Sequence, residues 1–306
     1  MVMYLKKLIS LLFLGAILLS SCRQPGLEKV VENLDFPEGP AWDGKGNLYL
    51  SNCHGGWIAK IKKQKAIEFL KASKDPFTFI KTNGLTIGKD GFIFACEYGI
   101  GAILRIHPKG ESEIYVKSYQ DSAFNRPNDL AFDAMGGLYF TDPKSYDPDN
   151  PDGYVYYIDT EKKVKRVAGP MAFPNGIAIN PDHTECFICE SAKHRIVVMK
   201  IQEDGYLKFD RILVDFDAGD PDGIAFDRAG SLYVALYGGG GVFIINPAGE
   251  IVNKIETPGA NPTNVEFGET DLKTLFITET ETNALYKIKV KIAGLPLYFS
   301  PMVKSR

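Results

Sequence analysis

The chain has 306 residues, of which 45% are apolar and 24% charged, and its formal net charge is −3. These values are typical of a globular protein that buries a substantial core. The slightly acidic balance, without a long basic run in the sequence, argues against nucleic acid as a partner.

The first 22 residues have the features of an export signal. Lys6 and Lys7 precede an apolar run over residues 8–19, and small residues follow as far as Cys22. The run is short for a membrane span, and residues 19–22 (Leu-Ser-Ser-Cys) resemble the lipobox of bacterial lipoproteins. An ordinary cleaved signal with an incidental cysteine is the alternative. We expect a lipoprotein-type signal peptide over residues 1–21 and an exported bacterial lipoprotein, periplasmic or on the cell surface, anchored to the membrane only by lipid.

A short motif recurs six times in the rest of the chain. In each copy an oxygen-bearing side chain precedes a short apolar run, and the copies are 42 to 47 residues apart. The six side chains are Glu38, Asn83, Asn128, Asn175, Asp222 and Asn264. A period of this length is typical of a β-propeller or another repeat array.

Each repeat contains the same series of predicted strands. An alternating run follows the polar residue, and a turn then leads to a stronger β run, such as residues 137–141 or 231–235. A polar or Gly-rich loop, a third run and a more variable fourth strand complete the repeat. Six such repeats predict an all-β fold, a six-bladed β-propeller with four-stranded blades, as a single domain over residues 22–306. We expect the early run at 27–31 to supply the missing fourth strand of the last blade.

The repeated polar position is predicted to form a ring at the mouth of the channel. The innermost strand of every propeller blade lines the channel, so equal offsets in six blades lie at one height. Carboxylates brought together there would repel one another, and a hard cation would relieve that repulsion. Turn chemistry is the alternative for Asn83 and Asn264, because Asn is common where a loop enters a strand. Glu38 is not a turn residue, which favours a ligand.

Other polar features have simpler interpretations. Cys186 and Cys189 would point to opposite faces of a strand and have no second pair to complete a zinc site, so these two are predicted to be buried thiols. Export permits disulfides among the four cysteines after the signal, but the sequence fixes no pairing. The acidic loop at 142–153 could form a wall or lid over the pocket, bind a peripheral cation, or be solvated. His54 and His194 lie in loops at the mouth, where an auxiliary base role is open.

Five segments, in order and in register, carry a family resemblance. They are Pro37-Glu-Gly-Pro40, Asn83-Gly-Leu-Thr86, Arg126-Pro-Asn-Asp129 with Tyr139-Phe-Thr-Asp-Pro143, Pro174-Asn-Gly-Ile177 and Pro221-Asp-Gly-Ile224. Together they resemble the gluconolactonase family that includes regucalcin (senescence marker protein) and the luciferin-regenerating enzyme. The resemblance extends over about residues 33–288.

That resemblance implies a set of site residues. Glu38, Asn175 and Asp222 match the ligands of one divalent cation, for which calcium is favoured and zinc, magnesium or manganese are alternatives. Asp222 also matches the residue proposed for proton transfer. Arg126 and Asn128 match substrate contacts, although in some bacterial members the equivalent of Asn128 also approaches the metal. We expect Asn83 to contact substrate as well.

The implied function is a divalent-metal-dependent hydrolase that opens a small, polar, sugar-derived lactone, and we expect a monomer. A metal-bound carbonyl and a carboxylate base would be sufficient for that reaction. The alternatives are a non-catalytic, metal-containing propeller that binds a ligand, another propeller esterase, or a strictosidine synthase-like enzyme. The sequence contains no Gly-x-Ser-x-Gly motif, which argues against a serine nucleophile.

Overall fold

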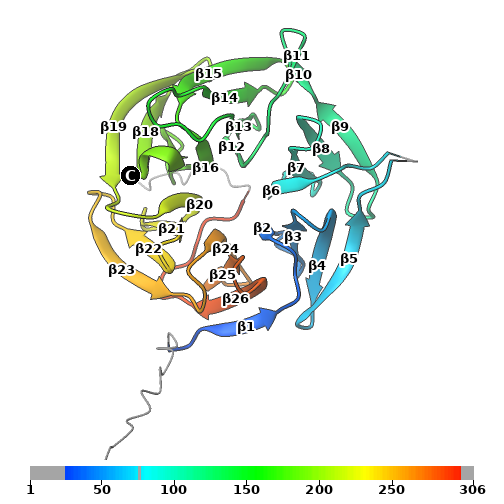
Figure 1. The fold of residues 1–306 in the computed structure, drawn as a ribbon, viewed down its shortest axis with the longest axis vertical. Helices are drawn as coiled ribbons and strands as arrows, with labels where there is room; N and C mark the ends of the chain where they lie inside the picture. Colours follow the sequence, from blue (N-terminus) through cyan, green and yellow to red (C-terminus); the bar gives the residue numbers. More distant parts are fainter. Residues whose placement is uncertain (1–24, 75–76, 298–306) are drawn as a thin grey trace, which may run out of the picture.

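The computed structural model describes residues 25–74 and 77–297, so the predicted signal segment and Cys22 lie outside the described residues. Within them, six four-stranded antiparallel sheets surround a central channel (Figure 1). The predicted six-bladed β-propeller is therefore confirmed. The described residues include one 3-10 turn, η1 (Ser191–Lys193), and none of their helices is long and apolar enough to cross a membrane.

The first five blades each take four consecutive strands, from the channel outward. Blade one is β2 (Pro37–Trp42), β3 (Leu48–Asn52), β4 (Trp57–Lys62) and β5 (Lys65–Lys71), and blade two is β6 (Thr82–Ile87), β7 (Ile93–Glu97), β8 (Ala102–Ile106) and β9 (Ser112–Val116). Blade three is β12 (Leu130–Phe132), β13 (Leu138–Asp142), β14 (Gly153–Ile158) and β15 (Val164–Met171). Blade four is β16 (Pro174–Ile179), β17 (Glu185–Glu190), β18 (Arg195–Ile201) and β19 (Leu207–Asp215), and blade five is β20 (Asp220–Phe226), β21 (Leu232–Tyr237), β22 (Gly241–Ile245) and β23 (Ile251–Glu256).

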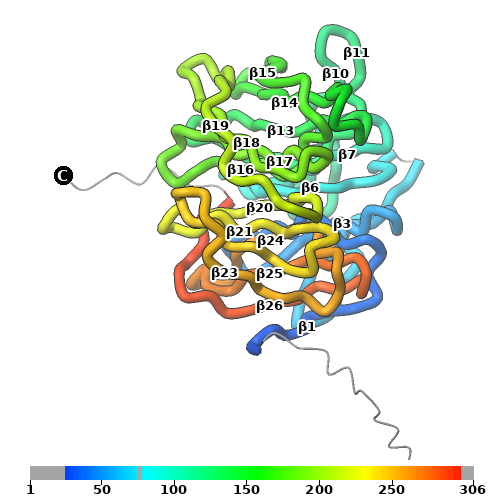
Figure 2. The backbone as a smooth tube through the Cα atoms, turned by 60° about the vertical axis from the view of Figure 1, so that its left-hand side comes forward, coloured from blue at the N-terminus to red at the C-terminus, as the bar shows by residue number. Residues whose placement is uncertain are grey.

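Blade six closes the ring by combining strands from both ends of the described chain. It consists of β24 (Pro262–Gly268), β25 (Thr274–Glu279), β26 (Ala284–Lys289) and β1 (Glu28–Val31). The strand β1 pairs antiparallel with β26, and Figures 1 and 2 show the two side by side. The prediction that the run at 27–31 supplies the fourth strand is confirmed. A short hairpin of β10 (Ser118–Tyr119) and β11 (Ser122–Ala123), which the sequence pattern did not predict, lies between blades two and three.

Aromatic side chains hold neighbouring blades together. Phe187 of β17 packs edge-on against Phe226 of β20, with ring centroids 4.8 Å apart, and Tyr233 of β21 meets Phe267 of β24 at 5.0 Å. Such pairs fix the relative position of packed sheets better than aliphatic contacts of equal area. The cysteines Cys53, Cys96, Cys186 and Cys189 are buried and free, which confirms the buried thiols predicted for Cys186 and Cys189.

The segment 291–297 runs across one end of the channel (Figure 1). The Leu295 N–H donates to the Phe226 carbonyl at 3.0 Å, and the Gly294 N–H donates to the Leu272 carbonyl at 2.8 Å. A Cβ atom on Gly294 would lie 1.9 Å from the ring of Phe267, so the close approach requires glycine. This segment closes the channel opposite the mouth.

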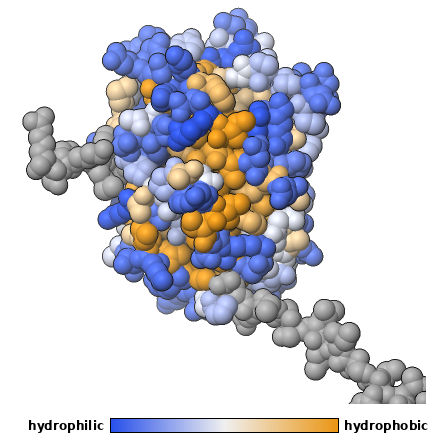
Figure 3. Space-filling view, turned by 90° about the vertical axis from the view of Figure 1, so that its left-hand side faces the viewer, coloured by the Kyte–Doolittle hydropathy of each residue, from blue (hydrophilic) through white to orange (hydrophobic). Residues whose placement is uncertain are grey.

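The face that carries β19 and β23 shows an apolar strip flanked by polar side chains (Figure 3). Exposed apolar side chains on these strands are Phe209, Ile212, Ile251 and Val252. Nothing in the described residues covers them.

Candidate functional site

Glycines let the inner strands approach one another at the level just below the mouth. A Cβ atom on Gly176 would lie 2.0 Å from the carbonyl oxygen of Asp222 in the next blade. A Cβ atom on Gly39 would lie 2.6 Å from the carbonyl oxygen of Asn83. Adjacent blades therefore meet backbone to backbone here, which sets the spacing of the polar residues that precede these glycines.

Blade six departs from the predicted ring. Pro262 pairs with the last residue of the second strand, as Pro174 does in blade four. The ring position is the residue after each proline, which is Asn175 in blade four and Thr263 in blade six. Asn264 lies one residue deeper, at the level of the glycines, so its predicted ring position was wrong. The ring position of blade six was assigned by residue type, because Asn occupies it in three other blades. The height of a residue in the channel is set by strand register instead.

The structure brings together the three residues predicted to hold a cation. The Asn175 side chain, across blades four and five, lies close enough to the Asp222 carboxylate to lower its pKa, although burial outweighs that effect. Glu38 comes from blade one, where its side chain accepts a hydrogen bond from the Gly39 N–H at 3.1 Å and is also bonded to Asn264. Its charge acts on Asp222, so the two carboxylates share one end of the channel.

These carboxylates perturb one another strongly. Burial and the charge of Asp129 raise the pKa of Glu38 to about 8. Burial, together with the charges of Glu38 and Asp129, raises the pKa of Asp222 well above its usual range. Among the described residues, no lysine or arginine is hydrogen-bonded to Glu38 or Asp222. The site therefore brings together carboxyl groups whose ionised forms the surrounding protein does not neutralise.

The donor set fits a hard divalent cation. It combines two carboxylates with the amide oxygen of Asn175, and such oxygen ligands suit calcium or magnesium. The nearby thiol of Cys53 donates to the Thr82 carbonyl at 3.0 Å, and burial raises its pKa well above the usual range, so it is not a thiolate ligand. Within residues 25–74 and 77–297, no three His, Cys, Asp or Glu side chains are grouped for a metal, so amide oxygens must complete any coordination here.

The predicted substrate residues lie on the rim of the channel. Asn83 and Asn128 are partly exposed, and Arg126 is exposed. The guanidinium Nη2 of Arg126 donates to the Lys144 carbonyl at 2.7 Å, while the backbone N–H of Arg126 donates to Asp142 Oδ1 at 2.7 Å. Asp142 thus fixes the backbone from which the guanidinium projects.

The loop between β13 and β14 reaches over blade four. The Tyr146 hydroxyl donates to the Ser191 carbonyl at 3.3 Å, and its ring lies 5.2 Å from that of Phe173. Burial and a hydrogen bond to Asp220 raise the pKa of Tyr146. Of the three interpretations of this acidic loop, these contacts favour a wall of the pocket. Sequence reasoning missed Tyr146, because nothing in a loop pattern shows which blade the loop contacts.

The two histidines at the mouth have different surroundings. His194 Nδ1 lies 2.9 Å from Asp220 Oδ1 and 3.1 Å from the Gly219 carbonyl oxygen. The exposed ring of His54 packs against Phe36, with centroids 4.3 Å apart. Only His194 is therefore coupled to a carboxylate in the same strand as Asp222.

Comparison with known proteins agrees with this geometry. The sequence profile described as "SMP-30/Gluconolactonase/LRE-like region" matches residues 36–281. The chain belongs to this family. The predicted resemblance is thereby confirmed, and the match includes every predicted site residue of this SMP-30/gluconolactonase protein.

Three relatives illustrate the similarity. A gluconolactonase from Zymomonas mobilis is 29% identical over 298 residues, which cover 88% of this chain and 82% of the relative. The structure of a gluconolactonase from Xanthomonas campestris superposes with a TM-score of 0.76 at 26% identity, covering 87% of this chain and 89% of the other. A calcium-binding regucalcin from Agrobacterium tumefaciens shares the fold, with a TM-score of 0.77 at 18% identity and coverage of 90% and 98%.

Proposed function

We propose that this protein is a divalent-metal-dependent hydrolase that opens a small, polar, sugar-derived lactone. The observation that carries the proposal is the set of buried Glu38, buried Asn175 and half-buried Asp222, whose carboxylates no basic side chain of the described residues neutralises. Arg126 is exposed just before β12, and its guanidinium is bonded to the Lys144 carbonyl. The gluconolactonase activity named for the relatives from Zymomonas mobilis and Xanthomonas campestris supports the reaction class.

Glu38, Asn175 and Asp222 would hold the ion. Calcium is favoured by the oxygen donors and by the calcium-binding regucalcin of the same fold, and zinc, magnesium or manganese remain alternatives. When bound, a divalent ion supplies polarisation of the lactone carbonyl and lowers the pKa of a water molecule.

Asp222 is the proposed proton carrier. In lactone hydrolysis, water adds to the carbonyl carbon and the ring C–O bond breaks, which leaves a carboxylate and a hydroxyl group. Asp222 would take the proton from the attacking water and return it to the alkoxide released by ring opening. Burial and the charge of Glu38 raise the pKa of Asp222, which makes its carboxylate a stronger base, whereas a bound cation acts in the opposite direction.

Arg126 would orient the substrate through its polar groups. Replacing Arg126 with alanine is expected to raise KM about ten- to a hundredfold, because a hydrogen bond to a charged group contributes roughly 1.5–3 kcal/mol. The effect on kcat should be smaller, since the guanidinium contacts the substrate before and during the reaction. Steady-state kinetics would measure the two constants separately. A fall confined to kcat would contradict a binding role.

A panel of lactones and linear esters tests the proposal. The protein would be stripped with a chelator and assayed with calcium, zinc, magnesium or manganese returned one at a time. Hydrolysis of a sugar lactone after an ion is returned is the expected result, with Glu38→Ala inactive under the same conditions. Tight calcium binding without turnover of any lactone would instead favour a non-catalytic binding propeller.

We also propose that the protein is exported and lipid-anchored through Cys22. The sequence of residues 1–22 supports this, and the proposal is independent of the reaction. Replacing Cys22 with serine is expected to move most of the protein from the membrane fraction to the soluble exported fraction in a bacterial host. Unchanged fractionation of the Cys22→Ser variant would exclude the anchor.

A further inference from the structure

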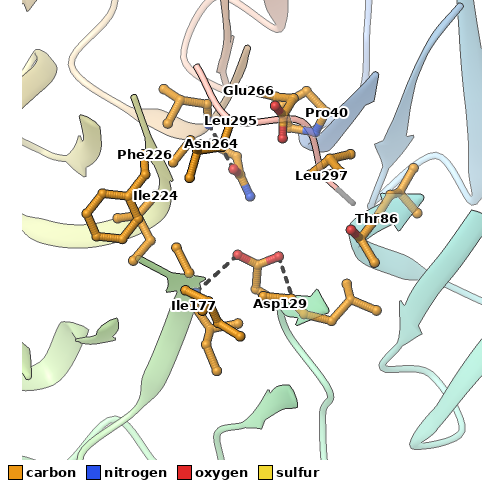
Figure 4. Close-up of a pocket in the computed structure, with 18 of the residues that line it drawn as sticks. Pro40, Thr86, Asp129, Ile177, Ile224, Phe226, Asn264, Glu266, Leu295 and Leu297 are labelled. Carbon is orange, nitrogen blue, oxygen red and sulfur yellow. Dashed lines mark hydrogen bonds between the residues drawn. The ribbon is translucent and has the colours of Figure 1, made fainter. Parts of the chain in front are cut away.

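The channel contains a second polar space below the level of Glu38 and Asp222. A cavity of about 80 Å³ lies between the inner strands, and Asp129, Thr86 and Glu266 contribute to its lining (Figure 4). Leu295 and Leu297 of the C-terminal segment close its far end. A cavity of this size has room for a few water molecules.

Small residues in the other blades create this space. Strand register places Asp129 at the level where four blades carry glycine, and it places Thr86 and Glu266 at a deeper level where the other blades carry alanine. The glycines are Gly39, Gly84, Gly176 and Gly223, and the alanines are Ala41, Ala131, Ala178 and Ala225. Asp129 and Asn264 are therefore the polar exceptions at the glycine level. Thr86 and Glu266 are the polar exceptions at the alanine level.

The hydroxyl of Thr86 is an unsatisfied group in this cavity. Thr86 is 1% exposed, and its Oγ1 has no hydrogen-bond partner among the described residues. Figure 4 shows its side chain directed toward the space that Asp129 also faces. A buried hydroxyl without a partner destabilises the folded protein, so an occupant that bonds to it would stabilise the fold.

The two carboxyl groups of the cavity are also incompletely satisfied. Among residues 25–74 and 77–297, the Asp129 carboxylate accepts hydrogen bonds only from the backbone N–H groups of Leu130 at 2.9 Å and Ile177 at 3.4 Å. Glu266 Oε1 accepts one from the Phe267 N–H at 2.7 Å. Burial, and to a lesser extent the charge of Asp129, raises the pKa of Glu266, and no basic side chain of the described residues is bonded to either carboxyl group.

We propose that this cavity binds a second, hydrated divalent cation between Asp129, Glu266 and Thr86. Water alone would satisfy the Thr86 hydroxyl but would leave Asp129 and Glu266, once ionised, without a counter-ion in the buried channel. A cation with its water neutralises both charges and supplies the missing partner for the hydroxyl. Because these residues belong to blades two, three and six, the ion joins opposite sides of the ring from inside. The site is separate from hydrolysis and does not depend on it.

Calcium stoichiometry tests the second site. The protein would be saturated with CaCl2, freed of excess ion by gel filtration and analysed by atomic emission. We expect two calcium ions per chain in the wild type and one in Glu266→Gln. Glu38→Ala should also keep one, whereas the double variant should keep none. Glu97→Gln is the matched control, because Glu97 is buried but bonds to loop N–H groups away from the cavity, and it should keep both ions.

Equal calcium content in the wild type and Glu266→Gln would overturn the proposal, whatever the number. Thr86→Val provides a second measurement that keeps the size of the side chain. It is expected to reduce the calcium-dependent rise in Tm and to weaken calcium binding at one of the two sites about tenfold. If calcium raises Tm equally in Thr86→Val and the wild type, the channel holds water alone and the inference fails.

Discussion

Replacing Asp222 with asparagine is expected to leave a folded protein that still binds its ion but hydrolyses lactones about a hundred- to ten-thousandfold more slowly. General acid–base catalysis by a positioned side chain contributes an acceleration of this order. Asparagine keeps the shape of the side chain and one oxygen that can bind an ion, the role proposed for Asn175 in the neighbouring blade, but it does not accept a proton from water. The kcat of the variant, measured together with its calcium content, checks both parts of the expectation.

The matched control for this substitution is Asp220→Asn. Asp220 lies two residues earlier in β20, and its carboxylate contacts His194 at 2.9 Å. Loss of that carboxylate is expected to change kcat much less than the loss of Asp222. If Asp222→Asn retained full activity while Asp220→Asn did not, the proton would move through the Asp220–His194 pair instead. Full activity in both variants would exclude either carboxylate as the base.

The strand pattern predicted the blades because every blade repeats the same local sequence pattern of strands and turns. Apolar alternation and turn residues decide which segments become strands, and a period of 42 to 47 residues decides how many blades form. Even the closure of the ring by residues 27–31 followed, because the last repeat lacked a fourth strand. These features depend on neighbours along the chain, which the sequence displays directly.

The interior of the channel was harder to predict because it depends on register between blades. Asn264 was assigned to the ring, although Thr263 occupies that position. Asp129 was recognised only as part of the Arg-Pro-Asn-Asp segment, and its place among four glycines became visible once the strands were aligned. Glu266 and Thr86 were likewise missed, because their positions among alanines became visible only from the strand register. A comparison of all six repeats at each successive offset would have found them, whereas the motif itself drew attention to the mouth.

The ion-free protein is expected to lose stability as pH rises. Burial and the charge of Asp129 raise the pKa of Glu38 from 4.5 to about 8, and burial raises that of Asp129 from 3.8 to about 7. The folded state therefore keeps protons that the unfolded chain has already released, and stability falls with pH while this difference lasts. The contribution of these retained protons to the free energy of unfolding is complete below about pH 4 and is lost by about pH 8. For Glu38 alone the lost contribution is roughly 5 kcal/mol, which lowers Tm by an amount on the order of 10 °C.

Thermal unfolding in a chelator between pH 5 and pH 8.5 measures this effect, and the same series in calcium is the comparison. A bound divalent ion replaces the protons on the carboxyl groups, so the fall in Tm with pH should largely disappear when calcium is present. Glu38→Gln carries no titrating group at that position and should show a shallower fall than the wild type in chelator. A Tm that is independent of pH in chelator would mean that these carboxyl groups are solvated in the ion-free protein. The driving force assigned to the cation at the mouth would then be absent, because water already stabilises the charges that the ion is expected to neutralise.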